Sequence, residues 1–381
     1  MKILFIQNIG NVIGGIANVN NTLATAFAED NNEVYIYSVR NATQINNVQK
    51  DKKIQYKIIN SKDKWECPRY SEVIKRIKKC NIIGALKQIV ERIKYDIILN
   101  KDYKKLKNEI IMLNPDVIIV SHYELLNAIP KIYLSKTINH YHTNFEQVLQ
   151  NKSQIKVFNK YKNKLRKFVW LTQNTCKKAI DFGIINSTYI YNPIPNKTIK
   201  KYNNIQRKLI FMARFSEEKR LELAIHIFNE VIEEKHLKDW KLDLYLVGEL
   251  TDDIKTKIDR NQYIDYKGKT DNPEEVFGEY YAMIMTSKFE GFPLTVLEAN
   301  MCKVPVIAFD FGESAKEVIK EETGILIKQD DIVEFKRKLF ELMQDEKYRD
   351  DLSRHAEIFA NHFKIENIKN NWYQIFLVER N

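Results

Sequence analysis

The chain has 381 residues, 44% of them hydrophobic and 29% charged, with a net charge of +11, and this length predicts two domains. The composition is that of a soluble globular protein, because no apolar run approaches the ~18–20 residues of a transmembrane helix. The four cysteines lack paired spacing, which argues against a disulfide framework or a zinc site and predicts a reduced, cytoplasmic protein.

Short apolar runs alternate with helical stretches through the first half of the chain. The opening MKILFIQNIG has too short an apolar core for a signal peptide and is predicted to be the first strand. After it, Ile16, Val19, Leu23 and Phe27 recur at helical spacing. Strand–helix alternation with continuous apolar strands predicts a parallel sheet covered on both faces. The strands are expected at 2–6, 33–37, 116–120, 136–142, 168–171 and 188–191.

The segment YNPIPNK (191–197) interrupts this pattern with two prolines and is predicted to be the domain boundary. Alternation then resumes, and an amphipathic segment at 367–379 is predicted to be a closing helix. We therefore expect an α/β protein of two doubly wound parallel-sheet domains, 1–192 and 193–365. In the second, strands are expected at 208–212, 242–247, 264–267, 282–286, 304–308 and 324–327, and helices at 218–234, 295–302 and 331–344.

The positive charge is concentrated in the first domain. Residues 1–192 contain 31 basic and 15 acidic residues, a net charge of +16, whereas the remainder has 30 and 35, a net charge of −5. The basic excess lies mainly in 71–110 and 151–168. Solvated helix faces explain it, and so does attraction to anionic lipid headgroups or an anionic acceptor. Nucleic acid is not expected as a partner, because no recognised binding module surrounds these lysines.

Ligands of open α/β sheets bind beyond the carboxyl ends of the strands, and each motif below follows a predicted strand. In NIGNVIGGIANV (8–19), Gly14 and Gly15 would let the backbone approach a ligand, and the helix N-terminus would offer N–H groups to a phosphate. The stretch is neither a G-x-G-x-x-G fingerprint nor a Walker A loop, which argues against a nicotinamide oxidoreductase. A simple tight turn is the alternative.

Cations and a glycine follow two strands of the second domain. In FMARFSEEKR, Arg214 and Lys219 flank the turn into a helix, where both could reach a diphosphate leaving group and replace a metal ion. In KGKTDNP, Gly268 and Lys269 end a strand whose backbone could hold a nucleobase. Ordinary strand–helix loops, the second leading into an N-capped helix, are the alternatives.

The stretch SKFEGFPLTVLEAN (287–300) places Glu290 and Glu298 around a loop between a strand and a helix. Glu290 could accept hydrogen bonds from sugar hydroxyls, and Glu298, one turn into the helix, could accept from both ribose hydroxyls. The alternative is a turn before a helix with an acid near its positive end. The intervening loop, whose N–H groups could meet the sugar or its phosphate, consists of Gly291, Phe292, Pro293 and Leu294.

The stretch EGFPLTVLEA, followed by VPVIAFDFGESAKEVI and TGILI, resembles the E-x7-E region of retaining glycosyltransferases of family 4, which have the GT-B fold. ARFSEEKR resembles that family's diphosphate-binding Arg…Lys element, and GGIANVNNTLATAFAEDNNEVYIYS resembles its N-terminal glycine loop. The resemblance spans both domains and is strongest over 208–328. It implies that a C-terminal helix, 366–381, crosses back to the first domain.

By this resemblance, Glu290 and Glu298 contact the donor sugar and ribose, Arg214 and Lys219 contact the diphosphate, and Gly15 approaches the donor or acceptor. No side chain is clearly placed as a covalent nucleophile. The family's favoured account is front-face attack, in which the departing diphosphate helps to deprotonate the acceptor. No D-x-D-type carboxylate cluster is present in the sequence, so neither a metal nor another cofactor is expected.

Family members often carry a histidine at the end of a strand of the first domain, near the donor sugar. INHYHTN (138–144) offers His140 and His142, and alternation along a strand puts both on one side, so spacing does not choose between them. His142, nearer the strand end, is the preferred catalytic candidate. A structural histidine under the loop is the alternative, and His122 is a weaker candidate.

The resemblance implies transfer of a hexose from a nucleotide diphosphate sugar, most often a UDP-sugar, to a hydroxyl with retention of configuration. The positive first domain suggests an anionic acceptor such as teichoic acid, or a lipid-linked glycan for capsule, lipopolysaccharide or glycoprotein assembly, with peripheral attachment to an anionic membrane. An epimerase or phosphorylase on the same fold is the first alternative. A basic nucleic-acid-binding protein is the second.

Overall fold

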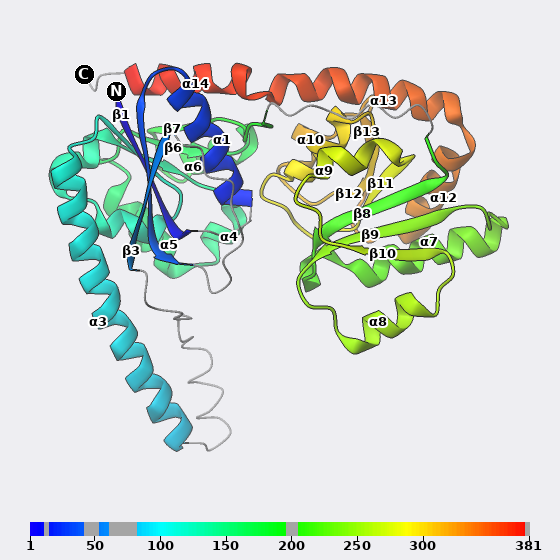
Figure 1. Cartoon of the computed structure of the whole chain (residues 1–381), viewed down its shortest axis with the longest axis horizontal. Helices are drawn as coiled ribbons and strands as arrows, with labels where there is room; N and C mark the ends of the chain where they lie inside the picture. The colour runs from blue at the N-terminus through cyan, green and yellow to red at the C-terminus, as the bar shows by residue number, and fades with distance from the viewer. Residues whose placement is uncertain (11–14, 42–52, 61–81, 196–204, 378–381) are drawn as a thin grey trace.

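The computed structural model shows two lobes, each a parallel sheet with helices on both faces (Figure 1). The α/β fold class predicted from the sequence is therefore confirmed, and so are the twelve predicted strands, with small changes at their ends. The structure describes residues 1–10, 15–41, 53–60, 82–195 and 205–377.

Within the described residues, the first lobe has a seven-stranded sheet in the order β3-β2-β1-β4-β5-β6-β7, with every neighbouring pair parallel. The order reverses between β1 and β4, the position at which doubly wound sheets bind ligands. The edge strand β3 was not predicted. The strands are β1 (Lys2–Gly10), β2 (Glu33–Asn41), β3 (Ile54–Asn60), β4 (Val117–Val120), β5 (Thr137–His140), β6 (Lys167–Trp170) and β7 (Ser187–Tyr189).

Helices of the first lobe begin and pack as their sequences direct. In α1, Val19, Leu23 and Phe27 are buried on the face predicted from their spacing. The helix α6 begins after Thr172, whose Oγ1 accepts a hydrogen bond from the N–H of Thr175 at 3.0 Å. The helices are α1 (Gly15–Glu29), α3 (Ile82–Leu113), α4 (Phe145–Leu149), α5 (Lys152–Tyr161) and α6 (Gln173–Asp181), with 3₁₀ turns η1 (Tyr123–Ala128) and η2 (Lys131–Lys136).

The second lobe repeats the architecture with six described strands in the order β10-β9-β8-β11-β12-β13, all parallel. The strands are β8 (Lys208–Arg214), β9 (Lys241–Val247), β10 (Ile264–Gly268), β11 (Ala282–Met285), β12 (Val306–Phe309) and β13 (Gly324–Ile327). The helices are α7 (Leu221–Lys235), α8 (Asp252–Asp259), α9 (Pro273–Val276), α10 (Leu294–Met301), α11 (Ala315–Val318), α12 (Ile332–Gln344) and α13 (Glu346–Ala360), with 3₁₀ turns η3 (Glu217–Lys219), η4 (Phe277–Glu279) and η5 (Asn361–Phe363).

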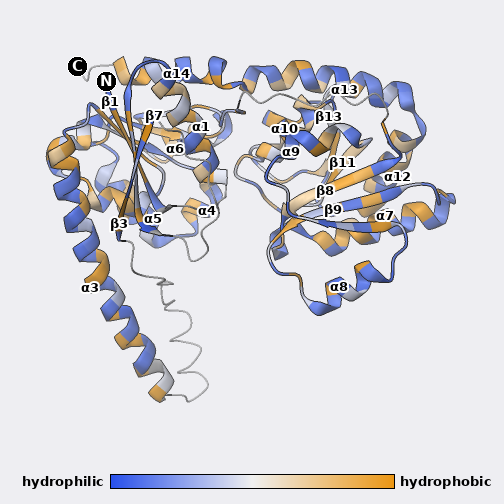
Figure 2. Ribbon diagram, in the orientation of Figure 1, coloured by the Kyte–Doolittle hydropathy of each residue, from blue (hydrophilic) through white to orange (hydrophobic). Residues whose placement is uncertain are grey.

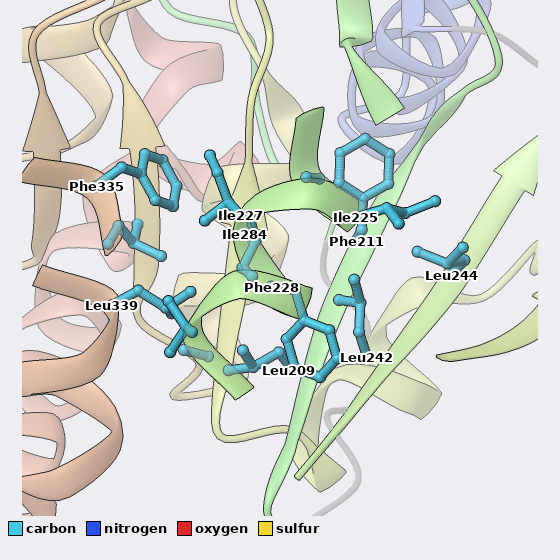
Figure 3. Close-up of a cluster of buried hydrophobic side chains, with 14 of the residues drawn as sticks. Leu209, Phe211, Ile225, Ile227, Phe228, Leu242, Leu244, Ile284, Phe335 and Leu339 are labelled. Atoms are coloured by element: carbon cyan, nitrogen blue, oxygen red, sulfur yellow. The ribbon is translucent and has the colours of Figure 1, made fainter. Parts of the chain in front are cut away.

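Apolar strands lie between amphipathic helices in both lobes, so hydrophobic colour concentrates in the sheets (Figure 2). In the second lobe, Phe228 of α7 and Phe335 of α12 share one buried core with Leu209 of β8 and Leu242 of β9, and all four side chains are without solvent exposure. Figure 3 shows these side chains gathered in one core. Full burial of each is expected to contribute on the order of 1.5–3 kcal/mol, so this core gives the site a rigid base.

The helix α14 (Ile365–Leu377) returns to the first lobe after α13 has run along the second (Figure 1). Its Tyr373 and Phe376 rings each lie 5.3 Å from the ring of Phe27 in α1. The Tyr373 hydroxyl donates a hydrogen bond to the Asp30 carboxylate at 2.9 Å. The last described helix therefore completes the core of the first lobe. None of the helices in the described part of the chain is long and apolar enough to cross a bilayer.

Candidate active site between the two lobes

A charged pair lies at the carboxyl ends of β8 and β11. Thr286, directly after β11, donates its Oγ1–H to the carbonyl oxygens of Lys219, at 2.9 Å, and Arg220, at 3.0 Å, which fixes the turn after β8. As a result Nζ of Lys219 lies 2.5 Å from Oε1 of Glu290. The two side chains keep only 15% and 12% of their exposure. Because both side chains are largely buried, each charge would be costly alone and is stabilised by the opposite charge beside it.

Gly291 marks a close approach of the two lobes. A Cβ at this position would lie 2.7 Å from the carbonyl oxygen of His142 and 3.6 Å from the Cα of Thr143. Only glycine leaves room for that backbone contact. The loop after β11 therefore lies directly against the loop after β5, and it carries Glu290 to the histidine segment of the first lobe.

The rest of this loop is anchored by aromatic packing. The Phe292 ring is buried and lies 5.6 Å from Tyr191 and 5.9 Å from Phe363, so it holds the loop in place. Pro293 then occupies the cap position of α10, and Leu294 begins the helix. Proline offers no side-chain acceptor, so it leaves the first-turn N–H groups uncapped by its side chain.

Glu298 lies one turn into α10 and is partly exposed. It thus stands on the same rigid helix that Leu294 begins, while Glu290 stands before it. The two carboxylates predicted from the sequence are held by one loop–helix unit, with Glu290 paired to Lys219 and Glu298 further along the helix.

The three candidate histidines form one cluster. The rings of His140 and His142 are 4.0 Å apart, and the Trp372 ring of α14 lies 4.9 Å from that of His140. Burial lowers the pKa of His140 to about 3 and that of His122 to about 4. Burial, and then the nearby His140 and His122, hold the pKa of His142 well below its usual range. All three imidazoles are neutral at pH 7.

The structure separates His140 from His142, which spacing could not. The strand ends at His140, so the predicted strand 136–142 is too long and alternation does not apply to His142. His140 is fully buried, whereas His142 is partly exposed beside Gly291. Within the described residues, Nε2 of His142 has no hydrogen-bond partner. It is therefore the histidine whose neighbours include the Glu290 loop.

Arg214 ends β8 and is exposed. Among the described residues it forms no ion pair, so its charge faces solvent. A backbone hydrogen bond, assisted by the charges of Lys219 and Arg214, lowers the pKa of Glu218. The end of β8 and the turn after it therefore carry three cations: Lys219 is paired with Glu290, Arg220 is paired with Asp330, and Arg214 is exposed.

The other residues predicted to contact the donor, Gly15, Gly268 and Lys269, lie outside the Lys219–Glu290 pair. Gly15 is the first residue of α1, and Gly268 ends β10 with φ +75°. A Cβ at either position would meet no protein atom within 4 Å, so the space beside both glycines is open. The ammonium of Lys269 lies 2.6 Å from the Asp271 carboxylate, so its charge is already compensated within the loop.

Sequence reasoning assigned no role to Glu313, which joins the lobes. The side chain is 5% exposed, and the residue follows β12. Its Oε2 accepts hydrogen bonds from the Thr175 hydroxyl, at 2.5 Å, and from the Phe145 N–H, at 3.3 Å, while its Oε1 lies 2.7 Å from Nζ of Lys178. Three groups of the first lobe thus converge on one carboxylate of the second.

Glu317 makes a second bridge of the same kind. Its carboxylate accepts hydrogen bonds from the N–H groups of Gln173, at 2.9 Å, and Asn174, at 3.0 Å, in the first turn of α6. The Tyr191 hydroxyl donates to it at 2.9 Å. A carboxylate at a helix N-terminus also interacts favourably with the helix dipole. The only signal in the sequence was two acids following a strand and a glycine.

Comparison with known proteins agrees with the resemblance found in the sequence. Residues 195–359 match the family model described as "Glycosyl transferases group 1". This segment holds the second lobe almost entirely, including the Lys219–Glu290 pair and the loop at Gly291. The resemblance to the glycosyltransferases is therefore confirmed over the second lobe.

Two curated relatives have printed functions. A poly(glycerol-phosphate) alpha-glucosyltransferase of Bacillus subtilis is 29% identical over 209 residues, which cover 53% of this chain and 28% of that protein. A poly(ribitol-phosphate) alpha-N-acetylglucosaminyltransferase of Staphylococcus aureus is 24% identical over 247 residues, covering 63% and 49%. The chain thus spans less than half the length of each.

The whole chain is similar in fold to solved structures. A mutant of TarM from S. aureus, in complex with fondaparinux, alpha-GlcNAc-glycerol and UDP, superposes with a TM-score of 0.75 at 15% identity, over 99% of this chain and 100% of that one. The match extends across both lobes, so the GT-B arrangement of two Rossmann-like domains is confirmed.

Proposed function

We propose that the whole chain, whose residues 195–359 match the model of the group 1 glycosyltransferases, transfers a hexose from a UDP-sugar to a hydroxyl of an anionic cell-surface polymer or a lipid-linked glycan, with retention of configuration. The observation that carries the proposal is the meeting of strand ends from both lobes. Lys219 and Glu290 of the second lobe form a 2.5 Å pair, and the adjacent Gly291 lies against the backbone of His142 in the first.

The charges at β8 suit a diphosphate leaving group. When the bond between the sugar C1 and the diphosphate oxygen breaks, negative charge develops on that oxygen. Cations already held in place stabilise such charge without reorganisation, and the end of β8 and its turn provide Arg214 and Lys219 for this role. In this proposal the protein needs no metal ion for the role.

Glu290 and His142 suit the sugar. An ionised carboxylate accepts hydrogen bonds from hydroxyls, and a neutral imidazole can donate or accept. Burial keeps His142 neutral, and its Nε2 has no partner among the described residues. Glu298 would accept from the ribose hydroxyls. These contacts orient the donor so that the acceptor oxygen forms its bond to C1 on the face that the diphosphate leaves, and the departing phosphate takes the acceptor proton.

The charge distribution supports an anionic acceptor. Residues 1–192 carry a net charge of +16, against −5 for the remainder. The two curated relatives are named for polymers of glycerol phosphate and ribitol phosphate, which bear one negative charge per repeat. A positive first lobe raises the local concentration of such a polymer, or of a lipid-linked glycan at the inner face of an anionic membrane. Association should therefore weaken as salt is added.

A donor screen tests the proposal. The purified full chain is incubated with a panel of nucleotide sugars, with and without a polyol-phosphate polymer or a lipid-linked glycan, and nucleoside diphosphate release is measured. We expect release to depend on acceptor and to fall on the order of 10²-fold in Glu290→Ala and Lys219→Ala. Lys336→Ala, which removes a surface ion pair with Glu230 (2.9 Å) in the same lobe, is the matched control and should remain active.

Four results would contradict the proposal. Near-normal turnover in both site variants would show that the pair is not part of the reaction. A free epimerised monosaccharide without acceptor would indicate an epimerase, and a requirement for inorganic phosphate would indicate a phosphorylase. Salt-sensitive binding to random oligonucleotides that ignores Glu290→Ala, with no reaction of any donor, would favour the nucleic-acid-binding alternative.

A further inference from the structure

The helix α3 extends well beyond the lobe that it leaves (Figure 1). Its C-terminal half is fixed to the first lobe, where Leu106 and Ile110 are fully buried. Asp102, also buried, accepts a hydrogen bond from Nδ2 of Asn60 at the end of β3, at 3.1 Å. Lys105 donates from Nζ to the carbonyl oxygen of Ile59 at 2.7 Å. One end of a 32-residue helix is thus rigidly held, and the other end projects.

The projecting half carries an apolar stripe. Its members recur at spacings of three and four residues, which places them along one side of an α-helix over about 20 Å. Between 49% and 84% of each of these side chains is exposed, and Figure 2 shows hydrophobic residues out to the free end of α3. The apolar stripe consists of Ile83, Leu86, Val90, Ile93 and Ile97.

The apolar stripe faces away from the lobe. At about 100° per residue, its members lie on the side of the helix opposite Asp102, Leu106 and Ile110, which hold α3 to the lobe. The contact with the lobe therefore cannot cover the stripe. Burying five large apolar side chains elsewhere would be favourable, since each contributes on the order of 1.5–3 kcal/mol when fully buried.

A row of lysines borders the apolar stripe. Lys87, Lys94 and Lys101 repeat every seven residues, one position beyond Leu86, Ile93 and Asn100, and all three are exposed. The nearest acid on the opposite border, Asp96, is bound to Arg92 at 3.2 Å. A stripe of isoleucine and leucine bordered by exposed lysines is typical of helices that lie in a membrane interface, where the lysine stems reach up to the headgroups.

A second copy of the helix would fit this border less well. In an antiparallel pair the lysine rows at Lys87, Lys94 and Lys101 would face each other and repel. The apolar stripe also extends over only two heptads, short of the three or four that a stable coiled coil needs. An anionic surface, by contrast, attracts each lysine and accepts the apolar side chains between them.

The neighbouring helix α5 adds charge of the same sign. Lys152, Lys156 and Lys160 recur every four residues along it and are exposed. Both helices hold the turn η1: the Tyr103 hydroxyl of α3 donates to the Glu124 carbonyl oxygen at 3.4 Å, and Lys160 donates to Oδ1 of Asn127 at 2.8 Å. The first lobe thus carries a second row of exposed lysines on a helix that contacts the same turn η1 as α3 does.

We propose that α3 lies on an anionic lipid surface, with the apolar stripe inserted at the level of the headgroups and Lys87, Lys94 and Lys101 bound to lipid phosphates. The attachment does not depend on the proposed reaction, and it would hold the first lobe at the surface where a membrane-bound acceptor is found.

Vesicle binding by the full chain tests the inference. The probe is a vesicle of phosphatidylglycerol and phosphatidylcholine, compared with pure phosphatidylcholine, in a sedimentation assay at low and high salt. We expect binding only to the anionic vesicles. Leu86→Gln/Ile93→Gln should weaken binding by at least about tenfold. Lys87→Gln/Lys94→Gln/Lys101→Gln should weaken it on the order of 100-fold, since each cation near such a surface contributes a factor of about five.

Matched variants in the second lobe test whether vesicle binding depends on the position of these residues in α3 rather than on the loss of apolar or basic residues in general. Val333→Gln/Ile358→Gln removes two apolar side chains that are at least as exposed as Leu86 and Ile93, and Lys238→Gln/Lys255→Gln/Lys347→Gln removes three exposed lysines. Both should bind anionic vesicles as the unaltered chain does. The lysine variants change only exposed charges, so they keep the test valid even if the apolar variant unfolds.

Several outcomes would overturn the inference. One is failure of the unaltered chain to bind anionic vesicles, and another is binding of the α3 variants as tight as that of their matched controls. A dimer in analytical ultracentrifugation without lipid, dissociated by Leu86→Gln/Ile93→Gln, would assign the apolar stripe to self-association instead.

Discussion

Gly291 of the second lobe contacts His142 of the first so closely that one added carbon would lie 2.7 Å from the His142 carbonyl oxygen. This contact sets the distance between the two lobes next to the Lys219–Glu290 pair. Catalysis between two lobes depends on that distance, because reacting groups must approach within bond-forming range.

We expect Gly291→Ala to lower kcat/KM on the order of 10²-fold. The new methyl group would push the two lobes apart and so lengthen the distance between the reacting groups. The melting temperature should change little, since the clash is relieved by separating lobes rather than by distorting a core. Gly324→Ala provides the contrast. Its Cβ would lie 2.6 Å from the Val306 carbonyl oxygen within the second lobe, so it should lower the melting temperature instead. An active Gly291→Ala enzyme would disprove this account.

The Lys219–Glu290 pair should contribute to stability as well as to turnover. Lys219→Met leaves the carboxylate of Glu290, which is 12% exposed, without its cation, and should lower the free energy of unfolding by roughly 3 kcal/mol. Lys219→Met/Glu290→Gln should regain most of that stability and remain inactive. Urea unfolding and donor turnover, measured on the same preparations, check both statements.

An exposed pair gives the control for this cycle. Lys257 lies 2.7 Å from Asp253 on α8, and both side chains are about half exposed or more. Lys257→Met should therefore lower the free energy of unfolding far less than Lys219→Met does. Equal losses in Lys219→Met and Lys257→Met would show that the pair at the site is not shielded from solvent.

Glu317 should hold the lobes closed. Glu317→Gln weakens the hydrogen bonds to the N–H groups of Gln173 and Asn174 and removes the negative charge at the start of α6. We expect a larger radius of gyration by small-angle X-ray scattering and a higher KM for the donor. Tyr191→Phe removes one hydrogen bond and keeps the two backbone bonds, so its effect should be smaller. An unchanged scattering curve in Glu317→Gln would count against this role.

The buried histidines predict a loss of stability in mild acid. The pKa of His140 is lowered by burial to about 3, whereas an unfolded histidine titrates near 6.5, so the unfolded chain binds more protons below pH 6.5. The free energy of unfolding should therefore fall as the pH drops from about 6.5. For His140 the loss between pH 7 and pH 5 should be ~2 kcal/mol. In His140→Asn, the drop in the free energy of unfolding between pH 7 and pH 5 should be smaller by that amount. An unchanged drop would contradict the lowered pKa of His140.

Turnover should not require a divalent metal. In the proposed reaction, Lys219 and Arg214 would supply the positive charge that a metal ion gives to the leaving diphosphate in other enzymes. We expect the same rate before and after treatment with a chelator, and a strong loss in Arg214→Ala. Recovery of a chelator-treated enzyme only on addition of Mg²⁺ or Mn²⁺ would refute the prediction.

The sequence predicted the fold well where strands are buried on both faces. Runs such as VIIV in β4 and VIAF in β12 are apolar throughout, which is typical of parallel strands covered by helices. The edge strand β3, IQYKIIN, was missed because its burial varies from residue to residue and a lysine interrupts it. The helix α3 was recognised only as a basic stretch, because its exposed apolar residues blur the helical pattern.

The site was predictable to the extent that it is local. Glu290, Gly291 and Glu298 fall within one loop and helix, so their spacing alone indicates a shared role. Glu313 and Glu317 were missed because their partners lie 126 to 168 residues away in the chain. The difference between His140 and His142 likewise depends on distant groups, the Trp372 ring and the Gly291 loop, whose positions are tertiary.

The position of α14 has a consequence for synthesis on the ribosome. The first lobe buries Trp372 and Phe376 in its own core, although more than 170 residues of the other lobe are translated in between. One apolar face of the N-terminal sheet therefore stays uncovered until α14 has left the exit tunnel. Such a long-range closure is slow and leaves the nascent chain prone to aggregation, so chaperones that shield apolar surface should raise the yield of this protein more than they would for a lobe completed in order.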